Sequence, residues 1–120
     1  MNKIDLDTER AVRRFMHLIP ARFGMKSAIL FGSRARGTHN ENSDADVAVL
    51  LAGQPQPVLK TSLDLADFAF DVLLETGINI TPIPVWMEEW QHPQTHSNPL
   101  LLANIAKDGV PFHEQKTDSD

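Results

Sequence analysis

The sequence of 120 residues contains no cysteine, so the fold cannot depend on disulfides and a metal site cannot use thiolate ligands. No apolar run approaches the ~18 residues that a membrane-spanning helix needs, and we expect no membrane association. The first ten residues, MNKIDLDTER, lack the apolar core of a signal peptide. Together these absences favour a reducing compartment, and the expected location is the cytoplasm.

The chain also lacks a positive net charge, because 11 Lys and Arg stand against 16 Asp and Glu and leave a formal charge of −5. This acidity argues against sequence-independent nucleic-acid binding, and no direct nucleic-acid contact is expected. The charge is unevenly distributed. Residues 1–40 hold 8 basic and 3 acidic residues, whereas residues 41–120 hold 3 basic and 13 acidic ones. This asymmetry fits a site where an anion and a cation meet, and equally two solvated faces.

Length and patterning predict one domain over residues 1–113, followed by a polar, disordered tail over residues 114–120. The spacing of apolar residues predicts both helices and buried strands. Helices are expected over residues 8–22, 33–37, 58–75 and 99–107, and strands over residues 26–31, 44–52 and 78–86. Pro82 and Pro84 lack N–H donors on the same side of the last strand, which suggests an edge strand.

The longest helical pattern, over residues 58–75, has two distinct faces. The face expected to be apolar is formed by Val58, Leu59, Leu63, Ala66, Phe70, Leu73 and Leu74. Asp64, Asp67 and Asp71 recur at helical spacing on another face. Such an acidic stripe is usually a solvated face, and the alternative is that it docks a basic partner.

The segment over residues 28–51 combines a Gly-Ser pair, ten intervening residues and an Asp-x-Asp pair. Gly32 follows a buried strand and permits close approach of a ligand to the backbone, and Ser33 begins a helical turn whose free N–H groups favour phosphate. Asp44 and Asp46 leave the same face of a strand, where they repel each other unless a cation lies between them. Because Mg²⁺ binds carboxylates together with substrate phosphates, this segment predicts a metal–nucleoside triphosphate site for nucleotidyl transfer.

Two arginines lie between these pairs and add positive charge beside Ser33. Arg34 and Arg36 are therefore candidate nucleotide-binding residues together with Gly32 and Ser33. The alternative is that one of the arginines pairs with an acid and braces the turn. A lone Gly-Ser or Asp-x-Asp carries little information, but both at this spacing between two apolar strands form a specific pattern.

FGSRARG…SDADVAVLL resembles the DNA-polymerase-β-like nucleotidyltransferase superfamily. The short chain is similar to its minimal nucleotidyltransferase (MNT) branch, and looks like the MntA-type antitoxins that are paired with HEPN-domain ribonuclease toxins. The resemblance implies an α/β (α+β) fold with a small mixed sheet flanked by helices. It also implies that Asp44 and Asp46 are the catalytic and metal-binding residues, with Mg²⁺ as cofactor and ATP as donor substrate. The implied function is a type VII-like antitoxin that transfers AMP to a hydroxyl of its HEPN toxin, within a hetero-oligomer.

The sequence departs from the superfamily pattern at a third carboxylate, which usually lies on a later strand and can act as a base. The matching strand, over residues 78–86, has no acid and offers Asn79 and Thr81 instead. The acids that flank it are unproven candidates: Glu75, Glu88 and Glu89. The alternative function is therefore a catalytically weak or inactive binding module that neutralises the toxin by direct occlusion.

Two further motifs have simpler interpretations. His92 and His96 hint at zinc, but Pro93 breaks the helix that would align them. Trp86 and Trp90 stack on adenine, face a partner or complete a small core, and the last role is the commonest one. Transfer to a small molecule or an RNA end would require an acceptor-binding domain, which this length does not accommodate without a partner chain.

Overall fold

The computed structural model describes residues 4–113, so the predicted disordered tail over residues 114–120 lies outside the described part. The helices are α1 (Leu6–Leu18), α2 (Ser33–Arg36), α3 (Val58–Thr76), α4 (Met87–Gln91) and α5 (Pro99–Asp108), with 3₁₀ turns at Ala21–Phe23 and Pro93–Thr95. The strands are β1 (Met25–Phe31), β2 (Ala45–Leu51), β3 (Ile80–Trp86) and β4 (Val110–Phe112). No helix within residues 4–113 is long and apolar enough to cross a bilayer.

The four strands form one mixed sheet in the order β3-β2-β1-β4. β1 pairs antiparallel with both β2 and β4, whereas β2 and β3 are parallel. The Ala45 N–H donates to the Asn79 carbonyl at 2.9 Å, so the alternating backbone groups of Pro82 and Pro84 face away from β2. The edge position predicted from these two prolines is confirmed, and the free edge of β3 lacks their two N–H donors.

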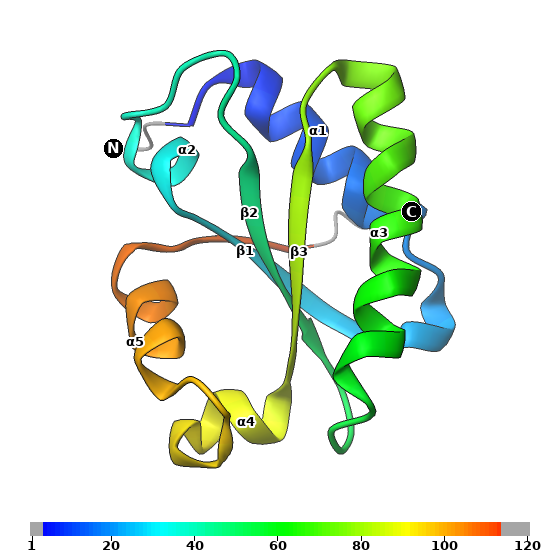
Figure 1. The fold of residues 1–120 in the computed structure, drawn as a ribbon, viewed down its shortest axis with the longest axis vertical. Helices are drawn as coiled ribbons and strands as arrows, with labels where there is room; N and C mark the ends of the chain where they lie inside the picture. The colour runs from blue at the N-terminus through cyan, green and yellow to red at the C-terminus, as the bar shows by residue number, and fades with distance from the viewer. Residues whose placement is uncertain (1–3, 114–120) are drawn as a thin grey trace, which may run out of the picture.

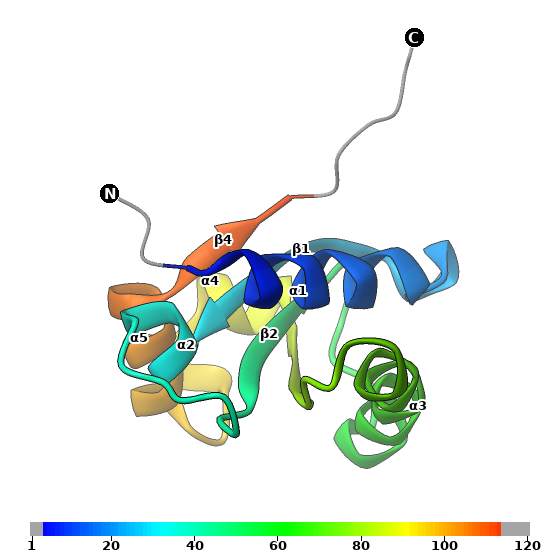
Figure 2. The same ribbon diagram turned by 90° about the horizontal axis from the view of Figure 1, so that it is seen from above.

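Helices cover both faces of the sheet, as Figures 1 and 2 show, with α1 and α3 on one face and α4 and α5 on the other. Alternate residues of β2 divide between the two cores. Val47 and Val49 belong to the core beneath α1 and α3, whereas Ala48 and Leu50 belong to the core beneath α5. The mixed sheet flanked by helices is therefore the architecture that the resemblance implies.

Helix α1 begins and ends earlier than the predicted range of 8–22. The Asp5 carboxylate accepts a hydrogen bond from the Thr8 N–H at 2.7 Å, and this N-cap starts the helix at Leu6. Ile19 is extended because a residue before proline avoids the helical conformation, and Pro20 follows it. The remaining predicted turn becomes the separate 3₁₀ turn at Ala21–Phe23.

Helix α3 has the predicted bounds to within one residue, but the predicted core face is wrong. The buried side chains are Leu65, Ala69 and Val72, whereas Leu59 and Leu74 are 72% and 70% exposed. Apolar residues occupy most of the circumference of this helix, so periodicity alone could not determine which part faces the sheet.

This orientation predicts that truncation of two leucines, two residues apart, lowers the free energy of unfolding by very different amounts. Leu65→Ala should lower the free energy of unfolding by about 2–5 kcal/mol, because Leu65 is fully buried. The matched control Leu63→Ala should change it by less than about 0.5 kcal/mol, because Leu63 is 60% exposed. Urea denaturation of both variants tests the orientation, and equal losses would contradict it.

Candidate nucleotide-binding site

The Gly-Ser and Asp-x-Asp pairs meet at one end of the sheet, where β1 leads into α2. Asp46 is paired in register with Phe31 of β1 on one side and with Thr81 of β3 on the other. Asp44 and Asp46 have the same strand parity as Ala48 and Leu50, so they lie on the face covered by α5. Asp44 is exposed and Asp46 half-buried, which places the pair on the open part of this face.

Gly32 brings the backbone against the Asp46 carboxylate. It adopts φ 78° and ψ −159°, a conformation that L side chains rarely adopt. A Cβ atom at this position would overlap Asp46 Oδ2. The Gly32 carbonyl accepts hydrogen bonds from the Ala35 and Arg36 N–H groups, both at 3.1 Å, and thereby starts α2 with Ser33 as its first residue. Glycine is thus required at the predicted position for both conformation and space.

The carboxylate pair carries electrostatic strain that a cation would relieve. Burial raises the pKa of Asp46, the negative charge of Asp44 raises it further, and Arg36 partly opposes both effects. The Thr81 hydroxyl donates to Asp44 Oδ2 at 3.3 Å and so orients this carboxylate. Two repelling carboxylates on an open face suit a hard divalent cation such as Mg²⁺, which takes oxygen ligands.

A third carboxylate is not brought to this pair. Glu75 forms a bidentate ion pair with Arg14, at 2.8 and 3.2 Å. Glu88 and Glu89 belong to α4, which follows the far end of β3, about 20 Å along the strand from its start. Thr81 is therefore the β3 residue beside the pair. Within the described residues, no group of three His, Cys, Asp or Glu could hold a metal.

The two arginines between the motifs have different environments. Arg34 is only 3% exposed, and its guanidinium donates to the Ser43 carbonyl at 2.8 Å and to Thr8 Oγ1 at 2.7 Å. It also contacts the carbonyls of Asn40 and Glu41 at 3.5 and 3.4 Å. Arg34 therefore braces the turn as the alternative expects, but through carbonyl and hydroxyl oxygens and not through the expected acid, whereas Arg36 is exposed.

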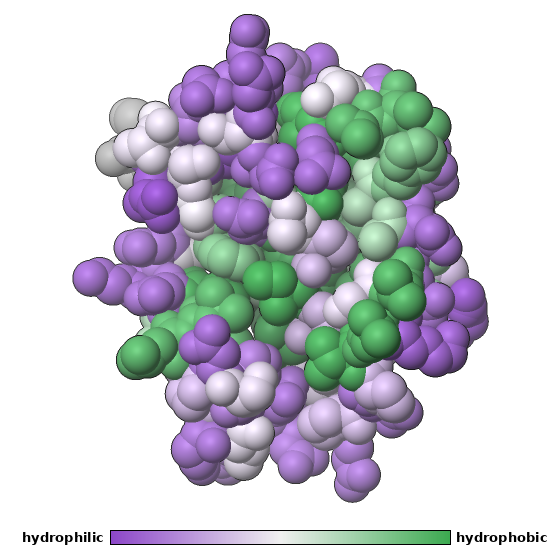
Figure 3. All heavy atoms as spheres, viewed as in Figure 1, coloured by the Kyte–Doolittle hydropathy of each residue, from purple (hydrophilic) through white to green (hydrophobic). Residues whose placement is uncertain are grey.

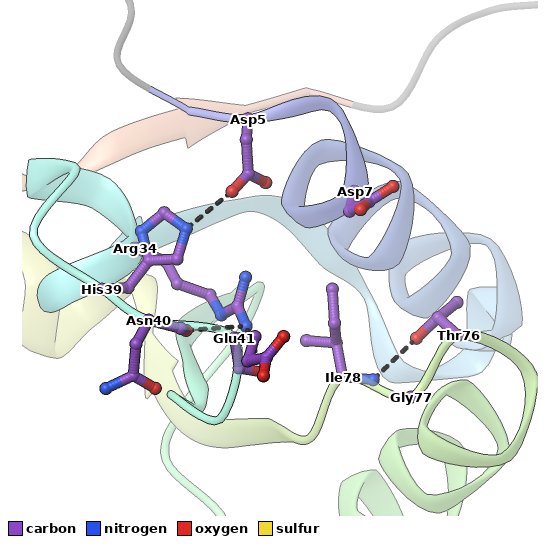
Figure 4. A pocket seen from close by; sticks show the side chains of 9 residues that line it. All are labelled: Asp5, Asp7, Arg34, His39, Asn40, Glu41, Thr76, Gly77 and Ile78. Carbon is purple, nitrogen blue, oxygen red and sulfur yellow. Dashed lines mark hydrogen bonds and ion pairs between the residues drawn. The ribbon is translucent and has the colours of Figure 1, made fainter.

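A polar cavity of about 350 Å³ lies beside this brace, between the start of α1, the loop over residues 38–43 and the turn after α3 (Figure 4). Asp5 Oδ2 lies 2.6 Å from His39 Nε2 across it. Hydrogen bonding from Thr8 and His39 lowers the pKa of Asp5 to about 2. Sequence reasoning missed Thr8 and His39 as supports of the loop, because neither belongs to a motif.

The zinc and tryptophan patterns are clarified by their contacts. His96 Nδ1 accepts from the Asn98 N–H at 2.9 Å, so this histidine stabilises the start of α5. Trp86 is 2% exposed within the core beneath α1 and α3, as the structural alternative expects. Trp90 is half-buried and packs against the core beneath α5.

A comparison of alanine variants at Gly32 and Gly53 separates the steric effect of the added Cβ from the strain of a positive φ. Gly32→Ala should destabilise the protein by at least ~2 kcal/mol and abolish Mg-ATP binding, because Asp46 must move. Gly53→Ala is the matched control, since its φ is also positive, at 89°, but no atom lies within 4 Å of the added Cβ. The control should lose about 1–2 kcal/mol and keep ligand binding. Denaturation and calorimetry measure both effects, and unchanged Mg-ATP binding by Gly32→Ala would contradict the assignment.

The raised pKa of Asp46 predicts a pH dependence in the metal-free protein. In the folded protein the pKa of Asp46 is raised above its ordinary value of 3.8, so the folded state keeps a proton that the unfolded state releases. The free energy of unfolding of the wild type therefore falls as the pH rises from about 3.8 through the raised pKa. Asp46→Asn lacks this loss, and its stability relative to the wild type should increase from pH 4 to pH 7. Parallel denaturation curves across this range measure the difference, and a decreasing difference would show that the sign is wrong.

Solved structures with the same fold are nucleotidyltransferases and toxin–antitoxin complexes. A provisionally assigned nucleotidyltransferase from Sulfolobus solfataricus superposes with a TM-score of 0.60 at 18% identity, covering 95% of this chain and 89% of that one. A toxin–antitoxin structure with AMP-PNP gives 0.60 at 20% identity, covering 94% and 77%. The MntA-HepT toxin–antitoxin structure gives 0.52 at 17% identity, covering 92% and 72%. At these identities the likeness shows the fold.

Sequence comparison identifies the family. The family model described as a nucleotidyltransferase domain matches residues 12–100, and the chain therefore belongs to this family. A Methanocaldococcus jannaschii protein, provisionally named a protein adenylyltransferase, is 38% identical over 73 residues, which are 59% of this chain. The match spans 50% of the length of that relative.

Proposed function

We propose that this nucleotidyltransferase-domain protein transfers AMP from ATP to a hydroxyl of a HEPN-domain toxin and thereby acts as its antitoxin in the cytoplasm. The observation that carries the proposal is the Asp44–Asp46 pair, held on the open face of the sheet against Gly32. The provisional name of the M. jannaschii relative supports protein adenylylation, and the toxin–antitoxin structures support a toxin partner.

Each residue of the site has a role in this reaction. Asp44 and Asp46 would hold Mg²⁺, and Gly32 and Ser33 bring backbone N–H groups to the triphosphate. When bound, the metal supplies charge neutralisation on the phosphates. Arg36 adds positive charge from α2, whereas Arg34 positions the loop that leads to Asp44. The acceptor oxygen bonds to the α-phosphorus as the bond to the leaving pyrophosphate breaks, and the acceptor proton passes to solvent water.

The proposed transfer is tested with labelled ATP, Mg²⁺ and a HEPN-domain toxin as the acceptor protein. Asp44→Asn/Asp46→Asn should reduce labelling of the toxin at least ~100-fold, because both metal-binding carboxylates are removed. Glu75→Gln/Glu88→Gln is the matched control, since it removes two carboxylates that lie away from the pair. Full labelling of the toxin by the Asp44→Asn/Asp46→Asn variant would contradict the proposal.

A second function is favoured by one observation, the hydroxyl of Thr81 where a third carboxylate is expected. A hydroxyl cannot accept a proton near neutral pH as a carboxylate does, so turnover would be slow. The protein would then neutralise its toxin by occluding it. In that case Asp44→Asn/Asp46→Asn still protects cells from the toxin, whereas loss of protection with the complex intact identifies transfer as the mechanism.

A further inference from the structure

The outward face of α3 carries a continuous apolar stripe that the fold does not bury. We call it the outer stripe and define it as Leu59, Leu63, Ala66, Phe70 and Leu74. Its members follow one another at intervals of three and four residues, so they share one side of the helix over more than four turns. Leu59, Phe70 and Leu74 are 72%, 56% and 70% exposed. Figure 3 shows hydrophobic side chains following α3 down the right of the view.

The outer stripe makes no contribution to the core, because α3 packs on the sheet through Leu65, Ala69 and Val72. The remaining large exposed hydrophobic residues among residues 4–113 are isolated or lie beside the stripe: Leu6, Val58 and Leu100. Contiguous exposed apolar surface of this kind marks interaction sites in soluble proteins. A row of leucines and a phenylalanine also has the spacing that a partner helix recognises.

Charge beside the stripe indicates the chemistry of the partner. Asp64, Asp67 and Asp71 form an acidic row along one flank, and the nearest cation on the helix, Lys60, lies 3.4 Å from Asp64. Overall α3 carries one lysine and four acids, and one of these acids is Glu75, which is paired with Arg14. A complementary surface is therefore apolar with a basic border.

A second copy of the chain complements this surface poorly. Antiparallel pairing of two α3 helices about a two-fold axis would place both acidic rows on the same side of the pair. Like charges across an interface oppose association and select against the wrong partner. The acidic row thus favours a different protein over self-association.

The position of the stripe connects it with the nucleotide site. α3 ends at Thr76 and β3 begins at Ile80, so Leu74 lies toward the end of β3 that carries Thr81 and its bond to Asp44. β3 is the edge strand, and in Figure 1 it runs between α3 and the layer of α4 and α5. Because α3 and the carboxylate pair lie on opposite faces of the sheet, a partner seated on the stripe reaches the pair by extending around the β3 edge.

We propose that the outer stripe docks an amphipathic helix of the toxin, with an apolar ridge bordered on one side by Lys and Arg. This inference rests on the proposed function, to which it adds the contact surface and the chemistry of the toxin segment. The partner helix lies along α3, its ridge covers the stripe, and its basic border faces Asp64, Asp67 and Asp71.

The first test uses the full chain and the same HEPN-domain toxin as the transfer assay. Leu63→Glu/Phe70→Glu should weaken the complex at least ~30-fold, because two carboxylates would enter an apolar contact. Leu6→Glu is the matched control, since Leu6 is equally exposed, at 57%, but lies on α1. Calorimetry measures the affinities, and circular dichroism checks that both variants fold. Wild-type affinity of the stripe variant would overturn the proposal.

The second test examines the charge of the partner. Asp64→Asn/Asp67→Asn/Asp71→Asn should weaken the complex about tenfold at low salt and flatten its salt dependence, because the attraction to the basic border is lost. Asp7→Asn/Glu41→Asn/Asp108→Asn removes three acids elsewhere and should leave the salt dependence unchanged. Tighter binding by the α3 variant would contradict a basic border, and stripe-dependent dimers of the chain alone would identify a second copy as the occupant.

Docking and AMP transfer fail in distinguishable ways. A complex that depends on the stripe but shows no labelling of the toxin contradicts the proposed transfer and supports the docking surface. If labelling and complex formation are both unchanged in the Leu63→Glu/Phe70→Glu variant, the docking surface is contradicted and the proposed transfer is not. Absence of any complex between the wild-type chain and the toxin contradicts both the partner and the surface.

Discussion

The buried guanidinium of Arg34 is the interaction on which the arrangement of the site depends. A charged group in the protein interior is tolerated only where hydrogen bonds replace its hydration. Arg34 meets this condition with the Thr8 hydroxyl on α1 and with carbonyls of the loop over residues 38–43. One side chain therefore links α1, α2 and the loop that delivers Asp44, so the two halves of the motif are held by a cation that faces away from solvent.

The carboxylate pair shows the opposite use of charge. Asp44 and Asp46 lie together on one face, and the pKa of Asp46 is raised first by burial and then by its neighbour. Neither carboxylate has a basic side chain within ion-pair distance among the described residues, although Arg36 lies near enough to lower that pKa. The fold thus surrounds the cation of Arg34 with internal acceptors and leaves two carboxylates on an open face without an ion-pair partner within residues 4–113, an arrangement that favours binding of a metal cation.

Local chemistry explains which features could be predicted from the sequence. The strands around the motif, the short helix after Gly32 and the edge position of β3 follow from apolar runs, glycine and proline, whose effects act over a few residues. The inward face of α3 could not be predicted, because apolar residues occupy most of the circumference of this helix and only one part of it packs on the sheet. Arg34 and Arg36 are two residues apart and chemically identical, so only the tertiary positions of Thr8 and of the loop carbonyls distinguish the brace from the exposed cation.

The charge asymmetry along the chain also has a structural basis. Several basic side chains of residues 1–40 form ion pairs or hydrogen bonds within the protein. Arg14 pairs with Glu75, and Arg13 pairs with Glu9 and stacks on the Phe112 ring at 5.1 Å. On α3, Asp64 pairs with Lys60 and Glu75 with Arg14, and Asp71 lies near enough to Arg14 to raise the pKa of that arginine. Because several cations of residues 1–40 are paired within the protein, the net negative charge of the chain is concentrated in its later residues, and the acidic row of α3 borders the outer stripe, where a basic partner can contact it.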